Sequence, residues 1–197
     1  MSSQVTLREH ARGAVRDEVM RRAWTLFAEQ GFEATTVDEI AAAAGMSRRT
    51  FFRYFTGKDE LVLERLLEAG DRVAAALRDR PADEPAWTAL RVAFSEIVAL
   101  QEQHVDRSRP LQIMLRDEPG VRASLLERQR RWHQMLTPLV ARRLSVWDGA
   151  SGPDVRAAAL AASAVACLDA AQLVWAENPG SRLSLLLDEA MGAAGSC

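Results

Sequence analysis

The chain has 197 residues and a formal net charge of −2, with 48% hydrophobic and 26% charged residues. These values exclude global disorder, a fibrous repeat and a surface coated in basic residues. Because its 11 glycines and 7 prolines gather at a few points instead of recurring at short intervals, an all-β fold is disfavoured and an all-α fold is predicted.

The first two predicted helices lie before residue 46. Apolar residues recur at helical spacing over 15–27, and Gly31 follows where a left-handed C-cap is expected. Thr35 and Thr36 offer hydroxyl N-caps for the second helix, and Glu39, three residues after Thr36, completes the pattern of a capping box. This short helix is expected to end at Gly45.

A third helix is predicted to begin at Ser47, another N-cap residue. Phe51 and Phe55 lie one turn apart and are expected to face the first two helices, while the arginines of this segment project elsewhere. Residues 56–58 interrupt the helix. Two short helices, joined by a tight turn with glycine and a new N-cap, are the sequence form of a helix-turn-helix.

The rest of the chain is predicted to be a bundle of helices. A helix over 59–80 and a loop over 81–85 come first. Further helices are expected at 86–107, 109–117, 119–145, 153–177 and 181–192, with a break over 148–153. The expected architecture is a three-helix helix-turn-helix domain over 1–60, followed by a helical-bundle domain over 61–197.

Several classes of protein are disfavoured by what the sequence lacks. The beginning of the chain has no apolar run, and the apolar stretch over 157–168 is far shorter than the roughly 20 residues that cross a bilayer. Cys167 and Cys197 fit neither a disulfide framework nor a metal site. We therefore expect a protein of the reducing cytoplasm, with no signal peptide and no membrane span.

No metal, cofactor or catalytic site is predicted. The histidines His10, His104 and His133 have no neighbour at the spacing of zinc ligands. The motifs of serine hydrolases, phosphate-binding glycine loops and zinc proteases are absent, and the nucleophiles Ser163 and Cys167 lie within a predicted helix without an evident base. The sequence therefore predicts that the chain is not an enzyme.

The third helix and its exit carry an unbalanced positive charge. Gly45 to Lys58 contains basic residues and no acidic residue, within a chain that is net negative. Arginine can donate a pair of hydrogen bonds to guanine in the major groove, and Lys58 and the hydroxyls of Thr36 and Tyr54 suit phosphates. Duplex DNA is the partner that this pattern favours; the alternative is a solvated basic helix face.

A series of positions in the first third shares one pattern of residue type and spacing. They are Ala23-x-x-x-Phe27, Gly31-Phe32, Thr36-Val37-x-x-Ile40-Ala41-x-x-Ala44-Gly45, Ser47-x-x-Thr50-Phe51-Phe52-x-Tyr54-Phe55 and Lys58-x-x-Leu61. In this pattern the chain resembles the tetracycline-repressor (TetR) family of bacterial transcription regulators. The resemblance implies that the helix from Ser47 enters the major groove and that Thr36, Tyr54 and Lys58 meet phosphates. The family usually has tyrosine at position 52, so Phe52 is expected to make only an apolar contact, such as one with a thymine methyl group.

The resemblance also implies a C-terminal bundle in which the last two long helices pair with a second subunit and the interior holds a small-molecule effector. The helices at 153–177 and 181–192 carry more apolar surface than one face needs, which fits a dimer seam. Large or polar groups on otherwise apolar faces are candidates to line the effector pocket, with ordinary core or surface positions as the alternative. They are Phe94, Gln101, Met114, Trp132, Met135 and Gln172.

The sequence thus predicts a cytoplasmic, homodimeric regulator that binds double-stranded operator DNA and is released by a small molecule, as a repressor is. The residues predicted to contact DNA are Thr36, Ser47, Arg48, Arg49, Thr50, Phe52, Arg53, Tyr54 and Lys58. A helical small-molecule-binding or interaction protein, whose basic helix is not used on DNA, is the alternative.

Overall fold

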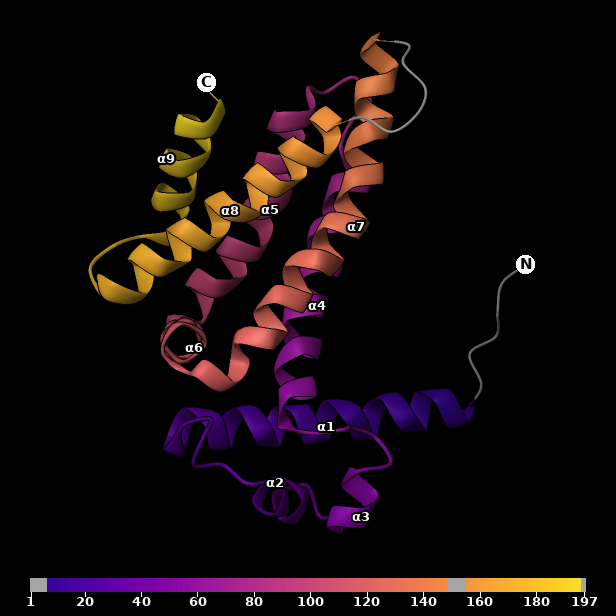
Figure 1. Ribbon diagram of the computed structural model, residues 1–197, viewed down its shortest axis with the longest axis vertical. Helices are drawn as coiled ribbons and strands as arrows, with labels where there is room; N and C mark the ends of the chain where they lie inside the picture. Colours follow the sequence, from indigo (N-terminus) through magenta and orange to yellow (C-terminus); the bar gives the residue numbers. More distant parts are fainter. Residues whose placement is uncertain (1–6, 149–154, 196–197) are drawn as a thin grey trace. The chain divides into compact units, whose positions relative to one another are not determined.

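The computed structural model describes residues 7–148 and 155–195, and the regular secondary structure of these ranges is helical (Figure 1). The predicted all-α fold is therefore confirmed. The chain divides into two compact units, the N-terminal unit over Met1–Glu64 and the C-terminal unit over Arg65–Cys197. The division falls inside helix α4 (Lys58–Asp79), so one continuous helix belongs to both units.

The N-terminal unit contains α1 (Leu7–Gln30), α2 (Val37–Ala43), α3 (Arg48–Phe51) and the first turns of α4. Helix α1 begins well before the apolar pattern over 15–27, because residues 10–14 are largely exposed and present no apolar face that a sequence pattern could reveal. Gly31 follows α1 with φ of 88°, and its N–H donates to the Phe27 carbonyl at 3.0 Å. This confirms the predicted glycine C-cap.

Helices α2 and α3 begin at the predicted caps. The Thr36 hydroxyl accepts from the Glu39 N–H at 3.2 Å, and the Thr36 N–H donates to Glu39 Oε2 at 2.7 Å, which completes the capping box. Ser47 Oγ accepts from the Thr50 N–H at 3.1 Å. Between the two helices Gly45 has φ of 68°, a conformation that side-chain-bearing residues rarely adopt.

An aromatic cluster forms the centre of the N-terminal unit. Phe27, Phe32, Phe51 and Phe55 are almost fully buried. The ring centroids of Phe27 and Phe32 lie 5.2 Å apart, and those of Phe51 and Phe55 lie 5.4 Å apart. The regular part of α3 ends at Phe51, but the Phe55 N–H still donates to the Phe51 carbonyl, so both rings point inward as the one-turn spacing predicted.

The C-terminal unit is a helical bundle. Its members after α4 are α5 (Ala86–Gln103), α6 (Val105–Asp117), the short 3-10 helix η1 (Pro119–Val121), α7 (Arg122–Asp148), α8 (Val155–Glu177) and α9 (Leu183–Gly195). These helices match the predicted ones closely except around residue 104. The predicted break over 148–153 lies almost wholly outside the described residues, as does Cys197.

The predicted division between helices over 86–107 and 109–117 was wrong. Helix α5 ends at Gln103, His104 takes non-helical angles of φ −131° and ψ 51°, and α6 begins directly after it. The break was predicted next to Pro110 because proline lacks an N–H. Pro110 instead lies inside α6, in its second turn, and His104 carries no turn signal of its own.

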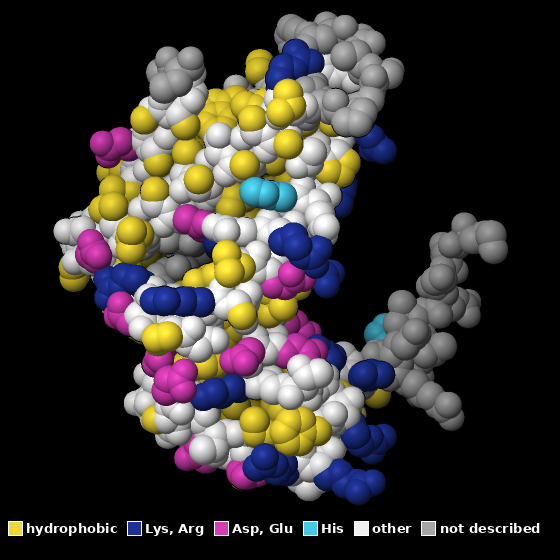
Figure 2. Space-filling view, viewed as in Figure 1, with side chains coloured by type: hydrophobic (Ala, Val, Ile, Leu, Met, Phe, Trp, Pro, Cys, Tyr) yellow, Lys and Arg dark blue, Asp and Glu magenta, His cyan; other side chains and the backbone are white. Residues whose placement is uncertain are grey.

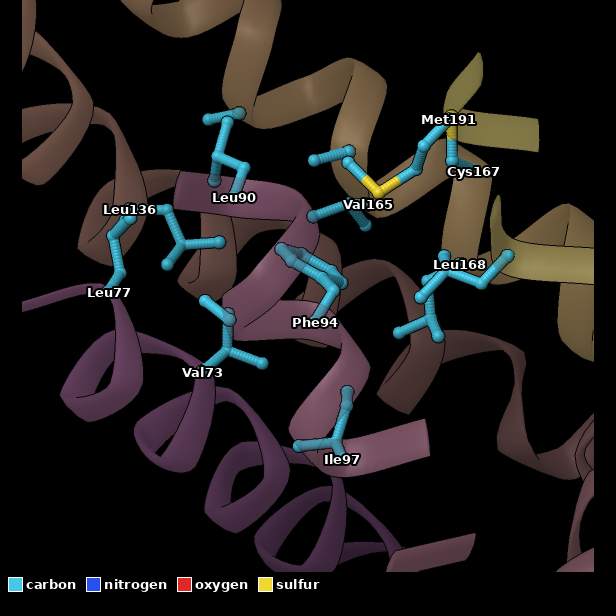
Figure 3. Packing of buried hydrophobic residues seen from close by; sticks show 14 of the residues in the cluster. Val73, Leu77, Leu90, Phe94, Ile97, Leu136, Val165, Cys167, Leu168 and Met191 are labelled. Atoms are coloured by element: carbon cyan, nitrogen blue, oxygen red, sulfur yellow. The ribbon is translucent and has the colours of Figure 1, made fainter. Parts of the chain in front are cut away.

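The core of the C-terminal unit is built from apolar side chains of α4, α5, α7, α8 and α9. Phe94 of α5 lies at the centre of this core and is fully buried, with Val73 of α4 and Val165 of α8 around it (Figure 3). Leu136 of α7 and Met191 of α9 complete the same cluster. The amphipathic faces that the sequence predicted therefore meet in one core.

Helices α4 and α7 approach closely at Gly70. A Cβ atom at this position would lie 2.3 Å from the indole nitrogen of Trp132, so only glycine lets the indole lie against α4. The same nitrogen donates to the Leu66 carbonyl at 3.1 Å. One turn of α4 thus holds the Trp132 ring by contact and by a hydrogen bond.

The C-terminal end of α4 is capped by Arg143 of α7. Arg143 is only 7% exposed, and its guanidinium donates to the carbonyls of Leu77, Arg80 and Pro81 at 2.6, 2.9 and 2.6 Å. The last carbonyls of a helix have no partner within the helix, and a cation satisfies them well. Both ends of the C-terminal portion of α4 are therefore tied to α7.

Candidate nucleic-acid interface

Two short helices and the four-residue turn between them create the surface on which the predicted site residues lie. Helix α2 ends at Ala43, the Met46 N–H donates to the Ala41 carbonyl at 2.9 Å, and α3 begins after the Ser47 cap. Because Phe51 and Phe55 face inward, the other side chains of α3 and its exit are turned outward. Arg48, Arg49, Phe52 and Arg53 are all exposed.

Phe52 is 46% exposed, which is unusual for a large aromatic side chain. Its ring meets Phe51 edge to face at 5.5 Å, and the Arg48 guanidinium lies 5.5 Å from its centroid. Arg48 also donates to the Asp38 carboxylate of α2 at 2.8 Å. The charge of Arg48 is therefore partly balanced, whereas Phe52 offers an apolar face to a partner.

Lys58, which was predicted to contact a phosphate, already has partners within the chain. Its Nζ donates to the carbonyls of Phe32, Glu33 and Thr35 at 2.7, 3.3 and 3.3 Å. An ammonium group has three donors, and these acceptors occupy all three of them. Nζ also lies 4.3 Å from the Phe32 ring centroid. In this structure Lys58 ties the start of α4 to the chain between α1 and α2.

The hydroxyl groups of the predicted site act as helix caps. Besides accepting from the Glu39 N–H, the Thr36 hydroxyl lies 2.8 Å from Glu39 Oε2, and the hydrogen bonds from Thr36 lower the pKa of Glu39. Ser47 Oγ lies 2.9 Å from Thr50 Oγ1. Thr36 and Ser47 are exposed and Thr50 is partly exposed, but each hydroxyl already has a partner within the chain.

Arg16 of α1 organises the exit from α3, and the sequence analysis did not identify it. Its guanidinium donates to Glu64 Oε2 at 2.6 Å, to Glu60 Oε1 at 3.3 Å and to the carbonyl of Tyr54, and it lies 4.3 Å from the Phe55 ring centroid. These partners lie 38 to 48 residues away in the sequence, so no local pattern marks the residue.

Glu60 is held in its ionised form by this arrangement. Burial by itself would raise the pKa of Glu60, but hydrogen bonds from the backbone and hydroxyl of Thr56, together with Arg16, outweigh burial and lower that pKa. The carboxylate thus joins three elements, namely α1, the turn after α3 and the start of α4.

Among the described side chains of the N-terminal unit, three cations have no carboxylate within ion-pair distance. They are Arg12 of α1, Arg49 of α3 and Arg53 at the exit of α3, and all three are exposed. Figure 2 shows Lys and Arg side chains gathered over α3 and the neighbouring part of α1. Uncompensated guanidinium groups on one surface favour a polyanion as partner.

Four of the residues predicted to line an effector pocket form two pairs in the C-terminal unit. Gln172 of α8 donates to Gln101 Oε1 of α5 at 3.2 Å. The rings of Phe94 and Trp132 meet at 6.0 Å with an interplanar angle of 64°. Of the other two predicted residues, Met114 is 8% exposed on α6 and Met135 of α7 packs against the core as a partly buried side chain.

A buried arginine, Arg128, lies beside Trp132 of one of these pairs and was not predicted. Arg128 of α7 is 5% exposed and donates to both oxygens of Asp169 of α8 at 2.7 and 2.9 Å. Its guanidinium also lies 5.3 Å from the Trp132 ring centroid. The Arg109 guanidinium of α6 lies 4.6 Å from the Trp175 ring centroid. The Nε atoms of Arg109 and Arg128 are buried without a hydrogen-bond partner.

Helix α8 is long and apolar enough to cross a membrane by length and composition, although the sequence predicted no span. One of its faces packs into the core of the C-terminal unit through residues such as Ala161, Val165 and Leu168. Asp169 on the same helix is paired with Arg128. These features are those of a helix that packs into the core of a bundle.

The fold and the exposed basic surface of α3 define the chain as a helix-turn-helix protein with an appended helical bundle, the architecture of a DNA-binding regulator. Residues 19–64 match the family model described as bacterial regulatory proteins, tetR family, and residues 84–195 match the model described as MftR C-terminal domain. The chain belongs to the TetR family of transcription regulators. Members of this family are not enzymes, as the sequence analysis predicted.

Comparison with known proteins gives relatives over most of the chain. The transcriptional regulator TcmR of Streptomyces glaucescens is 34% identical over 146 residues, which cover 71% of this chain and 65% of TcmR, slightly less than two thirds of its length. MftR of Mycobacterium tuberculosis, named for the regulation of mycofactocin biosynthesis, is 28% identical over 176 residues, which cover 86% of this chain and 81% of MftR.

A solved structure with the same fold contains a ligand. The crystal structure of the TetR-family repressor FadR from Thermus thermophilus, in complex with lauroyl-CoA, matches with a TM-score of 0.56 and 25% identity. The match covers 89% of this chain and 91% of that one. The predicted succession of a helix-turn-helix unit and a helical C-terminal unit is thus the fold of a known repressor.

Proposed function

We propose that the chain is a ligand-responsive transcriptional repressor, in which the N-terminal unit binds operator DNA and a small molecule in the C-terminal unit releases it. The observation that carries the proposal is the exposed surface of α3, where Arg49 and Arg53 have no carboxylate partner and Phe52 is half exposed. Its membership of a family of regulators, one of which is a repressor with a bound ligand, supports the same function.

In this proposal Arg49 reads the DNA sequence. It is the exposed arginine of α3 that neither Asp38 nor another described carboxylate neutralises, and arginine makes a bidentate pair with guanine in the major groove. Phe52 packs against a thymine methyl group. The DNA backbone lies beside Thr36, Ser47 and Thr50, whose hydroxyl groups already cap helices. Lys58 does not contact DNA but stabilises the surface through its hydrogen bonds within the unit.

The regulator is proposed to act as a homodimer through α8 and α9. Less than half of the most apolar part of α8 is buried within the chain. One exposed face of α8 carries only small or apolar side chains, namely Ala159, Ser163, Ala166, Ala170 and Leu173. Such a face is stabilised by a second copy of the same helix, and a two-fold dimer presents two copies of α3 to a palindromic site.

The effector is proposed to bind within the C-terminal unit, close to the Gln101–Gln172 pair and the Phe94–Trp132 pair. Both pairs connect α5 with other helices, and the unsatisfied Nε atoms of Arg109 and Arg128 lie in the same unit. Lauroyl-CoA, which is bound in the Thermus thermophilus FadR structure, is the first probe to titrate. Because the DNA of a bacterium lies in its cytoplasm, we propose that the protein is cytoplasmic.

Binding to duplex DNA at several salt concentrations tests the proposal. Phosphate contacts release counterions, so log Kobs should fall with log [salt] with a slope of about −0.9 per phosphate neutralised. A steep slope and a preference for one sequence, selected from a random pool, are expected. A flat slope would favour the alternative, a helical small-molecule-binding protein that does not use DNA.

A further inference from the structure

A hollow of about 400 Å³ lies on the surface of the N-terminal unit between α1 and the turn that follows α3. Ala11, Arg12 and Val15 line it from α1, and Arg53 and Tyr54 line it from the exit of α3. No acidic residue is among these five. Helix α1 took no part in the predicted contacts to DNA, so the hollow adds a new element to that surface.

The hollow joins two of the three cations that lack a carboxylate partner. Arg12 and Arg53 both line it, whereas Arg16, one turn further along α1, is occupied by Glu60 and Glu64. Two like charges in one small hollow repel each other, and an anion between them removes this repulsion. The lining therefore selects for a negatively charged ligand.

The lining is also held in place. The Arg12 guanidinium lies 5.9 Å from the Tyr54 ring centroid, within the range of a cation–π contact. The carbonyl of Tyr54 accepts from Arg16, which is itself fixed by two carboxylates of α4. Tyr54, and through its ring the Arg12 guanidinium, are thus held by contacts that exist before any ligand binds.

We propose that this hollow binds a backbone phosphate of duplex DNA, so that α1 belongs to the DNA interface. The proposal rests on the DNA-binding function proposed above. Arg12 and Arg53 donate to the phosphate oxygens, as guanidinium groups do with planar fork geometry, and the Tyr54 hydroxyl is a further donor. Ala11 and Val15 pack against the deoxyribose.

A phosphate of DNA fits the hollow better than a small free anion does. Arg12 and Arg53 are exposed, and exposed charges are screened so strongly by salt that a single small ion gains little from them. A polyanion gains from the release of its condensed counterions. Arg53 also follows α3 directly, so the hollow continues the surface that carries Arg49. Arg53 accordingly positions the protein on the backbone, while Arg49 reads bases.

The first test compares salt slopes for the full-length protein and its variants Arg12→Ala, Arg53→Ala and Arg78→Ala. The last variant is the matched control, because Arg78 is an exposed arginine of α4 in the C-terminal unit. On both selected operator and random duplex, Arg12→Ala and Arg53→Ala should each make the slope shallower by about 0.9 for every phosphate that is no longer neutralised. Arg78→Ala should leave it unchanged, and an unchanged slope for Arg12→Ala contradicts the proposal.

The second test locates the phosphate. In a series of operator duplexes, each carries one neutral methylphosphonate linkage at a different position. At one position the neutral linkage should weaken binding of the unchanged protein. It should not further weaken binding of the variant Arg12→Ala. Additive losses of affinity at every position would contradict the proposal. A flat salt slope of the unchanged protein would instead contradict DNA binding itself, so the two failures can be told apart.

The third test distinguishes DNA from a free phosphate. Inorganic phosphate and deoxyadenosine monophosphate are titrated in the absence of DNA and followed by NMR of the arginine side chains. We expect binding at millimolar concentration only. Micromolar binding that Arg12→Ala abolishes, with an unchanged DNA salt slope in that variant, would show that the hollow serves a free phosphorylated molecule and would overturn the proposal.

Discussion

At the scale of single residues, the partners of a cation decide what it can do. Arg48, Arg49, Arg53 and Lys58 look alike in the sequence as four positive charges on one short segment. In the structure Arg48 is paired with Asp38 and Lys58 is saturated by three carbonyls, so only Arg49 and Arg53 retain uncompensated charge. The same residue type thus serves two purposes, support of the fold and contact with a partner.

Replacement of Lys58 by methionine should destabilise the protein. The variant keeps the alkyl chain over Phe32 but leaves the carbonyls of Phe32, Glu33 and Thr35 without the ammonium donor. Hydrogen bonds of a charged group contribute about 1.5 to 3 kcal/mol each at most, and we expect a total loss of about 2 kcal/mol because water reaches this partly exposed site. Urea unfolding followed by circular dichroism measures the loss.

Replacement of Arg49 by alanine should have the opposite profile. No described side chain pairs with Arg49, so the free energy of unfolding should stay within about 0.5 kcal/mol of the original value. Operator affinity should fall by about 1 to 3 kcal/mol, with a smaller loss on random duplex, because a bidentate contact to guanine is removed. Fluorescence anisotropy with both duplexes checks this, and equal losses would show that Arg49 contacts only the backbone.

At the scale of elements, α4 is connected at three places along its length. Arg16 binds Glu60 and Glu64 in its first turns, Trp132 meets it at Gly70, and Arg143 caps its end. Each connection joins α4 to another helix within the same compact unit. A change in the C-terminal unit that moves α4 therefore acts on a helix whose first turns hold the exit from α3.

The contact at Gly70 predicts an unusual effect of alanine in a helix. Gly70→Ala should destabilise the protein by about 1 to 3 kcal/mol, because the new Cβ would lie 2.3 Å from the Trp132 nitrogen. This overpacking outweighs the gain of about 1 kcal/mol that alanine usually brings to a helix interior. Gly13→Ala in α1 is the matched control, since nothing lies within 4 Å of its Cβ and stabilisation is expected. Thermal unfolding of both variants measures the two effects. An equal change of stability in Gly70→Ala and Gly13→Ala would contradict the contact.

The carboxylate of Glu60 makes the stability of the protein depend on acid pH. Because the pKa of Glu60 in the folded protein lies below its ordinary value of 4.5, its contribution is present above that pH and is lost as the pH falls through the lowered pKa. Glu60→Gln should be less stable than the original protein at pH 7, and the difference should shrink below pH 4.5. Urea unfolding at a series of pH values measures it; a difference independent of pH would show that charge is unimportant here.

At the scale of the whole molecule, the exposed face of α8 supports the homodimer proposed above. One exposed face of α8 carries small and apolar side chains and no charged one. The opposite face of the helix packs into the core of the C-terminal unit. A regulator that binds a two-fold operator needs two recognition helices at a fixed separation, about 34 to 36 Å or a multiple of it. In the proposed dimer, the second copy supplies the second recognition helix.

A charged residue on this face should prevent assembly. Leu173 is 48% exposed in the single chain, and Leu173→Glu would bury two unpaired carboxylates in a symmetric interface. Light scattering at micromolar concentration should then show a monomer, and operator affinity should fall at least tenfold. Leu126→Glu is the control because Leu126 is 68% exposed on α7, outside this face. A dimer that survives Leu173→Glu but not Leu126→Glu would place the interface elsewhere.

The sequence by itself determined the features that local chemistry controls. The Thr36 and Ser47 caps, the glycines at the ends of helices and the inward spacing of Phe51 and Phe55 all act within a few residues, so they could be read directly and agree with the structure. The resemblance to TetR regulators rests on the same local pattern. The break at His104 escaped detection because no local signal marks it.

Only the tertiary structure decided which polar groups pair. Arg16 with Glu64, Arg128 with Asp169 and Arg143 with the end of α4 join residues more than 40 positions apart in the sequence, and their pairing depends on how helices pack. The same packing gives the Lys58 ammonium three carbonyl partners and leaves Arg49 and Arg53 without a carboxylate partner. It also brings Arg12 beside Tyr54. A charge is visible in the sequence, but whether it is neutralised depends on distance in space, because electrostatic interactions weaken with separation and not with sequence position.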